Sequence, residues 1–457
     1  MLFSSIPFLF YFLPCVLLLY GITPKSAKNL TLLICSLFFY AWGEPRLVIL
    51  MLLTVFCGYI LGLLTEKYRS YKKLFLALAV ALSLGFLGYF KYADFFIENI
   101  NAVTHLSIPL LNVALPIGIS FYTFQLLSYN IDVYREDVPA QRNFIDLAAY
   151  ISLFPQLIAG PIVRYSDVAA QLRERTHSFD KIAIGIRRFI MGLSKKILIA
   201  NVLGEICEIF KASNDKSILF FWIYAIAFSL HIYFDFSGYS DMAIGLGKIF
   251  GFDFMENFNY PYISKSITEF WRRWHISLGS WFRDYVYIPL GGSRVGKVRL
   301  LFNILIVWML TGFWHGADWN FILWGLYFAA LLIVEKVFLL KWLNRSKFIS
   351  RIYLLTLIII SFVIFNAASA QEAFEYIGGM FGVGSYPIIS YETIFYLKDY
   401  LFVLLLAVIG ATPIPKMVAG KFKAAKWLEP VALLVLLVIV TAYLVDGSFN
   451  PFLYFRF

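Results

Sequence analysis

Residues 47–64 read LVILMLLTVFCGYILGLL, a continuous run without a charged side chain. A helix needs about 20 predominantly apolar residues to cross a hydrocarbon core about 30 Å thick, because each residue adds about 1.5 Å. This run is therefore a candidate transmembrane helix. The class of the whole protein depends on whether the rest of the chain repeats the pattern.

The same apolar pattern recurs along all 457 residues. Candidate spans lie near 3–22, 30–43, 47–64, 74–91, 109–128, 145–161, 187–210, 218–236, 299–314, 319–340, 352–367, 399–412 and 429–446. Two of them, 109–128 and 145–161, contain prolines, and broken helices at membrane depth occur only where they line protein or a watery cavity. We expect roughly eleven true spans plus a few re-entrant pieces, with a cavity near the two proline-containing stretches.

Composition points to the same class of protein. The chain is 61% hydrophobic and 15% charged, with a mean hydropathy of +0.76, whereas soluble domains carry about 25% charged residues. An outer-membrane barrel would instead show segments of alternating polarity about ten residues long. We predict an all-α integral membrane protein with a single polytopic domain at 1–457, since no linker-like stretch divides the chain.

The net charge of +11 comes from short basic clusters between the apolar runs. This distribution follows the positive-inside rule and is unlike the basic stripe of a nucleic-acid-binding domain. Lys25 and Lys28 lie in the loop 23–29, and four basic residues lie in the loop 65–73, two spans later. Both loops are predicted to be cytoplasmic, which places the N-terminus outside.

The first candidate for chemistry is His315, in residues 308–320, which read WMLTGFWHGADWN. Ionisable groups at membrane depth are costly and are functional candidates by default. Burial keeps an imidazole neutral, so it can accept the proton of a hydroxyl as a general base. Thr311, Trp314 and Asn320 are its candidate neighbours in a binding pocket. The alternative is a structural histidine with satisfied hydrogen bonds.

The second candidate is His275, in residues 267–285, which read ITEFWRRWHISLGSWFRDY. The apolar positions have helical spacing and predict one amphipathic helix, either at the interface or beneath the bundle. Glu269, Arg272 and Arg273 occupy the other face. His275 would be a second site residue and the arginines would bind phosphates or a carboxylate. Snorkelling of the arginines on a surface helix is the alternative.

A third polar group lies in residues 228–241, which read FSLHIYFDFSGYSD. His231 and Asp235 are four positions apart, share a helix face and could pair. A metal site is the weaker alternative, because no third nitrogen or sulfur ligand lies at a useful spacing. Asp241 is expected to face inward, without an assigned role. The four cysteines form no CxxC pair and predict neither a disulfide nor a metal.

Two short motifs, WRRWH at 271–275 and WHG at 314–316, carry a family resemblance. Six longer stretches accompany them in order: 36–43 SLFFYAWG, 115–125 LPIGISFYTFQ, 154–164 FPQLIAGPIVR, 234–241 FDFSGYSD, 287–292 YIPLGG and 450–457 NPFLYFRF. The chain resembles the membrane-bound O-acyltransferase superfamily. It looks most like the membrane subunit of bacterial alginate O-acetylation and its peptidoglycan and cellulose O-acetylation relatives.

The resemblance implies a ring of tilted helices around a central funnel, in a bacterial cytoplasmic membrane. The family's two histidines map to His315 and His275, and the residues around them become donor-binding candidates: Arg272, Arg273, Trp274, Thr311, Trp314 and Asn320. His315 would be the general base or a covalent acyl carrier. His275, Thr311 or Asn320 would stabilise the oxyanion that develops during acyl transfer. The implied donor is a cytoplasmic substrate, acetyl-CoA, and no bound cofactor is expected.

An extracytoplasmic partner of the SGNH hydrolase type is implied as well, and it would pass the acetyl group to a polysaccharide. It would supply the nucleophilic serine, since the chain has no GxSxG motif. One alternative keeps the histidines but transfers D-alanine from a carrier protein to teichoic acid. Another, of a different class, is a transporter of polymer or lipid-linked sugar, for which the sequence shows no inverted repeat.

Overall fold

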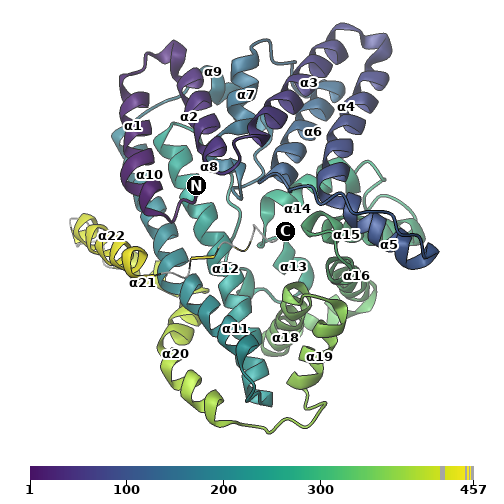
Figure 1. Ribbon diagram of the computed structural model, residues 1–457, viewed down its shortest axis with the longest axis vertical. Helices are drawn as coiled ribbons and strands as arrows, with labels where there is room; N and C mark the ends of the chain where they lie inside the picture. The colour runs from purple at the N-terminus through teal and green to yellow at the C-terminus, as the bar shows by residue number, and fades with distance from the viewer. Residues whose placement is uncertain (422–427, 448–449, 452, 454–457) are drawn as a thin grey trace. The chain divides into compact units, whose positions relative to one another are not determined.

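The computed structural model describes residues 1–421, 428–447, 450, 451 and 453, and the regular elements in these ranges are helices (Figure 1). The predicted all-α membrane fold is confirmed, since eight described segments are long and apolar enough to cross a bilayer. They are Leu47–Lys67, Arg69–Thr104, Ile218–Ile249, Lys297–His315, Trp319–Leu343, Lys347–Asn366, Tyr391–Gly410 and Leu428–Asp446. A shorter apolar helix covers Pro7–Ile22. Roughly eleven spans around a funnel stay a prediction.

Contacts within the chain group into two compact units. Unit 1 contains Met1–Phe189 and Ser240–Met255, and unit 2 contains Ile190–Tyr239 and Glu256–Phe457. The division falls inside α10 (Phe179–Ser194) and α12 (Ile218–Ile249). Of the terminal motif at 450–457, positions 452 and 454–457 lie outside the described residues.

Unit 1 is built mainly from helices joined by short turns. Its complete helices are α1 (Leu13–Ile22), α2 (Lys28–Gly43), α3 (Leu47–Lys67), α4 (Lys72–Leu87), α5 (Ala93–Thr104), α6 (Ile119–Arg135), α7 (Phe144–Ser152), α8 (Phe154–Leu157) and α9 (Tyr165–Arg173). Helices α3, α4 and α6 pack against one another. The apolar run 47–64 lies inside α3, as predicted.

Two hydrogen bonds, Asn29 to Asp146 and Arg142 to Glu66, link residues of the two basic loops, 23–29 and 65–73, to the segment 140–146. Both loops therefore lie at one end of this unit.

The two proline-containing stretches are broken in the structure, as expected. Residues 105–118 precede α6 without forming a helix, and the stretch 145–161 divides into α7 and α8 at Leu153. Proline at the start of α8 suits a first helical turn, where its missing N–H costs nothing. The cavity described below is lined by other residues, so a cavity beside these stretches stays a prediction.

Unit 2 holds the later helices. They are α11 (Val202–Ala212), α13 (Ile267–Trp271), α14 (Ile276–Phe282), α15 (Lys297–His315), α16 (Trp319–Val334), α17 (Leu340–Leu343), α18 (Lys347–Asn366), α19 (Ala370–Met380), α20 (Tyr391–Gly410), α21 (Ile414–Lys421) and α22 (Leu428–Asp446). Side chains that accept first-turn N–H groups begin α16, α18, α19 and α20. Three π-helical turns also occur here, at Lys195–Asn201, Arg283–Tyr287 and Glu335–Leu339. Such turns often accompany functional sites.

Candidate active site

The segment that carries His275 is not one helix. Helix α13 ends at Trp271, α14 begins at Ile276, and His275 lies between them with a φ of 45°. The prediction of a continuous amphipathic helix over 267–285 is therefore wrong. The residues near Asn257 supply the competing hydrogen bonds: Asn259 N–H donates to Arg273 O at 2.9 Å, and Ile276 N–H donates to Asn257 O at 3.0 Å. Helical spacing could not reveal a partner this far upstream.

Asn257 also fixes the proton on His275. Its Oδ1 lies 3.1 Å from the Ser277 backbone nitrogen, 2.9 Å from Ser277 Oγ and 3.2 Å from His275 Nδ1. Because a backbone N–H can only donate, the Asn257 atom at this position must be the oxygen. His275 Nδ1 therefore carries the proton, and the lone pair is on Nε2. His275 Nε2 is buried and has no hydrogen-bond partner among the described residues.

His275 is 1% exposed and lies outside the eight candidate membrane-spanning helices. Burial, reinforced by the nearby His315, lowers the pKa of His275 well below its usual value. The charged imidazolium is disfavoured because burial removes the solvation that would stabilise the charge, and a second imidazolium nearby would repel it. At neutral pH the imidazole is neutral and Nε2 is able to accept a proton.

The two predicted histidines lie in one aromatic cluster of unit 2. His315 ends α15, is 6% exposed, and packs against the rings of Trp314, Trp324 and Phe365 at centroid distances of 5.0, 5.1 and 5.3 Å. The Trp314 ring also lies 6.1 Å from the His275 ring. From α12, Phe236 meets His275 edge-on at 4.6 Å. The structure thus brings His275, Trp314 and His315 together.

A cavity of about 850 Å³ has His275 in its wall. Its lining is mostly apolar, with basic side chains from three segments. The lining residues are Thr268, Trp271, Arg272, His275, Ile276, Leu278, Gly279, Ser280, Phe282, Arg283, Tyr287, Ile304, Val307, Trp308, Thr311, Leu332, Lys336 and Leu340. Ile304 to Thr311 covers about 10 Å of α15, at about 1.5 Å per residue. One wall of the cavity therefore extends over about two turns of α15.

Gly312 of α15 packs closely against Gly325 of α16, and this contact fixes the position of the end of α15 that carries His315. A Cβ added at Gly312 would collide with the carbonyl of Phe321 and lie 3.1 Å from Gly325 Cα. Small residues let membrane helices approach closely enough for direct backbone contact. The α15–α16 hairpin, visible in Figure 1, thus depends on glycine one turn before His315.

The other wall of the cavity is held by Glu335, a residue that the sequence analysis missed. Its carboxylate is fully buried and accepts hydrogen bonds from the backbone nitrogens of Ile267 and Thr268, at 2.6 and 2.9 Å, and from the Thr268 hydroxyl at 2.7 Å. A carboxylate at the start of a helix satisfies N–H groups that have no partner inside it. Glu335 therefore anchors α13 to the end of α16. No local motif marks Glu335 or Asn257.

Arg272 and Arg273 have different surroundings. Arg272 is exposed and lines the cavity. Arg273 pairs with Glu269 at 2.9 Å, so its charge already has an acidic partner. Trp274 is buried and stacks on Phe270 with centroids 5.5 Å apart. Arg272 is therefore the better placed of the two arginines for a ligand, while Trp274 packs the core.

Thr311 and Asn320 have hydrogen-bond partners within the protein. The Thr311 hydroxyl lines the cavity but donates its proton to Val307 O at 2.7 Å. Asn320 donates from Nδ2 to Ala367 O at 2.8 Å and accepts the Phe321 backbone N–H on Oδ1 at 2.9 Å. The Thr311 proton is therefore used within its own helix, and Asn320 links the start of α16 to the end of α18.

The third polar group is structural in its contacts. His231 Nδ1 donates to Ala200 O at 2.6 Å. Asp235 forms a 2.6 Å ion pair with Lys196, and both side chains are buried. Asp235 also accepts the Leu453 backbone N–H at 3.2 Å, while Lys196 donates to Pro451 O. In unit 1, Asp241 pairs with Arg188 at 2.9 Å.

Comparisons with known proteins agree with this geometry. The model of the membrane-bound O-acyltransferase family matches residues 34–371. A relative from Pseudomonas putida, named a probable alginate O-acetylase AlgI, is 40% identical and covers 100% of both chains. The peptidoglycan O-acetyltransferase of Helicobacter pylori is 34% identical over 84% of this chain and 80% of its own.

A more distant relative is the teichoic acid D-alanyltransferase of Bacillus subtilis. It is 31% identical over 51% of this chain and 62% of its own length. The family match covers most of the chain, including both histidine motifs. The chain belongs to the membrane-bound O-acyltransferase family and is a multi-pass membrane O-acyltransferase.

Proposed function

We propose that the protein transfers an acetyl group from acetyl-CoA on the cytoplasmic side toward O-acetylation of an extracytoplasmic polysaccharide. The observation that carries the proposal is the cavity of about 850 Å³ with His275 in its wall. The relative that aligns over its full length is named for alginate O-acetylation, and the Helicobacter pylori relative is named for O-acetyl transfer to peptidoglycan. Both names support the acetyl group and a polysaccharide acceptor.

The cavity suits a donor with a phosphate end and an apolar arm. Arg272 and Lys336 line it and form no ion pair among the described residues, while Arg283 pairs with Asp284 at 2.6 Å. Cationic side chains bind phosphates, and apolar walls favour the uncharged thioester arm. Lys336 lies at the end of α16 next to Glu335, whereas His275 lies at the other end of the α13 segment. A donor with its phosphates near Lys336 would extend its thioester toward His275.

Acyl transfer then needs a general base for the proton of the acceptor hydroxyl. The acceptor hydroxyl oxygen attacks the acetyl carbonyl carbon, its proton moves to an imidazole, and the thioester C–S bond breaks. The proton then passes to the leaving sulfur, which departs as the thiol of coenzyme A. Neutral His275 offers Nε2 for this proton, and His315 is the second imidazole within the same aromatic cluster. We assign both histidines as catalytic, and either imidazole can take this proton as the general base.

Orientation follows from charge. Both basic loops lie at one end of unit 1, and cytoplasmic loops carry the excess of lysine and arginine. We therefore propose a bacterial cytoplasmic membrane location with the N-terminus outside. The acceptor of the acetyl group would be an SGNH-type partner on the outer side, which then esterifies the polymer.

The test is transfer of label from acetyl-CoA in membranes that contain this protein and an SGNH-type protein encoded near it. Label should appear on the partner or the polymer. His275→Ala and His315→Ala should each lower the rate by about 100- to 10,000-fold, the usual contribution of a general base. His105→Ala is the matched control, because His105 is an exposed residue of unit 1. Full activity in both site variants would disprove the assignment.

D-alanyl transfer is the second candidate, supported by the shorter match to the Bacillus subtilis relative. The same membranes should be given a D-alanine-loaded carrier protein in a parallel reaction. Label from the carrier and none from acetyl-CoA would replace the acetyl proposal with this one. Label from neither, with a folded protein, would favour transport.

A further inference from the structure

One end of unit 1 gathers basic side chains around Tyr20, in the last turns of α1. The Tyr20 hydroxyl donates to Phe250 O at 2.9 Å, and His177 Nε2 lies 3.0 Å from the Tyr20 hydroxyl oxygen. Because a phenol has one proton, His177 must donate to Tyr20. Tyr20 is 5% exposed, so these bonds hold its ring in a fixed position.

Two cations lie against this ring. Lys28 Nζ is 4.2 Å from the Tyr20 centroid, and the Arg175 guanidinium carbon is 6.0 Å from it and 4.5 Å from the centroid of Phe252. The Arg175 guanidinium interacts with the Tyr20 hydroxyl, but its Nη1 is buried and has no hydrogen-bond partner of acceptable geometry among the described residues. A buried donor without an acceptor is costly and needs an explanation.

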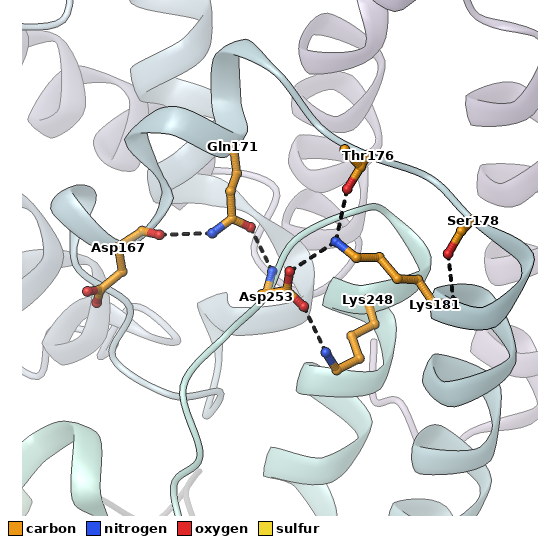
Figure 2. A network of polar contacts seen from close by, with 7 residues as sticks. All are labelled: Asp167, Gln171, Thr176, Ser178, Lys181, Lys248 and Asp253. Carbon is orange, nitrogen blue, oxygen red and sulfur yellow. Dashed lines mark hydrogen bonds and ion pairs between the residues drawn. The ribbon is translucent and has the colours of Figure 1, made fainter.

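Several other cations of unit 1 have acidic partners. Figure 2 shows Asp253 between Lys181 and Lys248, with ion-pair distances of 3.1 and 2.7 Å. Within the described chain, neither Lys28 nor Arg175 has a carboxylate at ion-pair distance. The acid that acts on Arg175 from further away is Asp146, which accepts a hydrogen bond from Asn29 at 2.7 Å.

Electrostatics at this place favour an anion. Burial and the charges of Arg175 and Lys25 lower the pKa of Lys28, and burial together with Lys28 and Arg175 lowers the pKa of His177. Like charges held close together repel one another, and the repulsion is strongest where water is excluded. A negative ligand would relieve this repulsion and supply the acceptor that Arg175 Nη1 lacks.

We propose that Lys28 and Arg175 form a binding site for the phosphate of an anionic ligand. A guanidinium binds two phosphate oxygens through its planar fork, and an ammonium adds a point charge. A phospholipid headgroup is one source, since Leu18 and Ile22, on either side of Tyr20, are 70% and 81% exposed and apolar. Tyrosine at such a position is typical of a membrane interface. A soluble phosphate compound would use the same contacts. This site does not depend on the proposed transfer reaction.

The test compares Lys28→Gln/Arg175→Gln with a matched control, Arg69→Gln/Lys72→Gln. The control removes two positive charges from the same unit, but its cations have Glu136 as partner. Purified full chain in neutral detergent is mixed with phosphatidylglycerol, and native mass spectrometry counts the bound lipid. Wild type and control should retain it. The site variant should bind it about tenfold or more weakly, because each cation near an anionic lipid contributes about 1 kcal/mol.

A second titration with inorganic pyrophosphate separates the two sources. A soluble ligand is supported if pyrophosphate binds to wild type and displaces phosphatidylglycerol, and if the site variant no longer binds pyrophosphate. Retained lipid in the presence of pyrophosphate would support a headgroup. Equal lipid and pyrophosphate binding by wild type and site variant, or equal loss in the control, would overturn the proposal. If Arg175→Gln does not fold, the single variant Lys28→Gln provides the test. Lys28 is half-buried, and its replacement should still weaken lipid binding severalfold.

Discussion

Unit 2 contains two buried polar regions that differ in how fully their polar atoms are paired. In the region of Lys196 and Asp235, the ion pair is completed by the Pro451 carbonyl and the Leu453 N–H. At His275 one ring nitrogen is bonded to Asn257, and the other is buried without a partner among the described residues. Buried polar groups that hold a fold are normally satisfied. A buried group with an open atom is a candidate for chemistry.

Breaking the Lys196–Asp235 ion pair should lower the stability of the protein more than any other change proposed here. Lys196→Met leaves Asp235 buried without its counter-ion, and removal of one partner of a buried pair costs about 3–5 kcal/mol. The melting temperature of the purified protein in detergent should fall sharply. The double variant Lys196→Met/Asp235→Leu should recover most of the loss. A single variant as stable as wild type would show that the pair does not hold this region.

Gly312→Ala tests the histidine region, through the helix that carries His315. The added Cβ meets the Phe321 carbonyl and Gly325 Cα, and overpacking of this kind costs about 1–3 kcal/mol. Thermal melts should show the loss, together with lower activity. Gly296→Ala is the control, because a Cβ there has open space. Equal stability of both variants would contradict the close approach.

Asn257→Asp should change the chemistry of His275 without removing it. A carboxylate beside Nδ1–H stabilises the imidazolium, which raises the pKa that burial now lowers. The acid limb of the activity–pH profile should move to higher pH, and the rate near neutrality should fall about tenfold. Asn259→Asp, at an exposed position of the same segment, should leave the profile in place. An unshifted profile in Asn257→Asp would exclude His275 as the titrating base.

The smallest change in stability is expected from replacing Asp253, which is shown in Figure 2. Its bond to Lys248, reinforced by Lys181, lowers the pKa of this carboxyl. The stabilisation is therefore present above the unfolded carboxyl pKa and is lost as the pH falls through the lowered folded value. Because the side chain is 48% exposed, the pair contributes less than about 1 kcal/mol. Asp253→Asn should lower the melting temperature slightly at neutral pH and not at strongly acidic pH.

Helices were predictable from local composition, because an apolar run must satisfy its own backbone hydrogen bonds in lipid. The run 47–64 became α3, and WHG at 314–316 became the end of α15. The break at His275 was not predictable, since Asn257 and Asn259 lie well upstream and act through backbone hydrogen bonds. Helical spacing describes one segment at a time and contains no information about such partners.

The site was predictable at its histidines and not in its supporting residues. Motifs identified His275 and His315, and the structure places both in one aromatic cluster. Asp235 was expected to share a helix face with His231, but its counter-ion is Lys196, from a run that reads as apolar. The roles of Glu335 and Asn257 depend on chain segments that meet only in the fold.

The bond between Asp235 and Leu453 joins residues 218 positions apart. At a synthesis rate of about 5–20 residues per second, the ribosome adds Leu453 about 10–40 s after Asp235. During this interval the interior of unit 2 contains a carboxylate with an incomplete set of partners. We therefore expect a late step in the folding of this enzyme, in which Pro451 and Leu453 complete the hydrogen bonds of the Lys196–Asp235 pair.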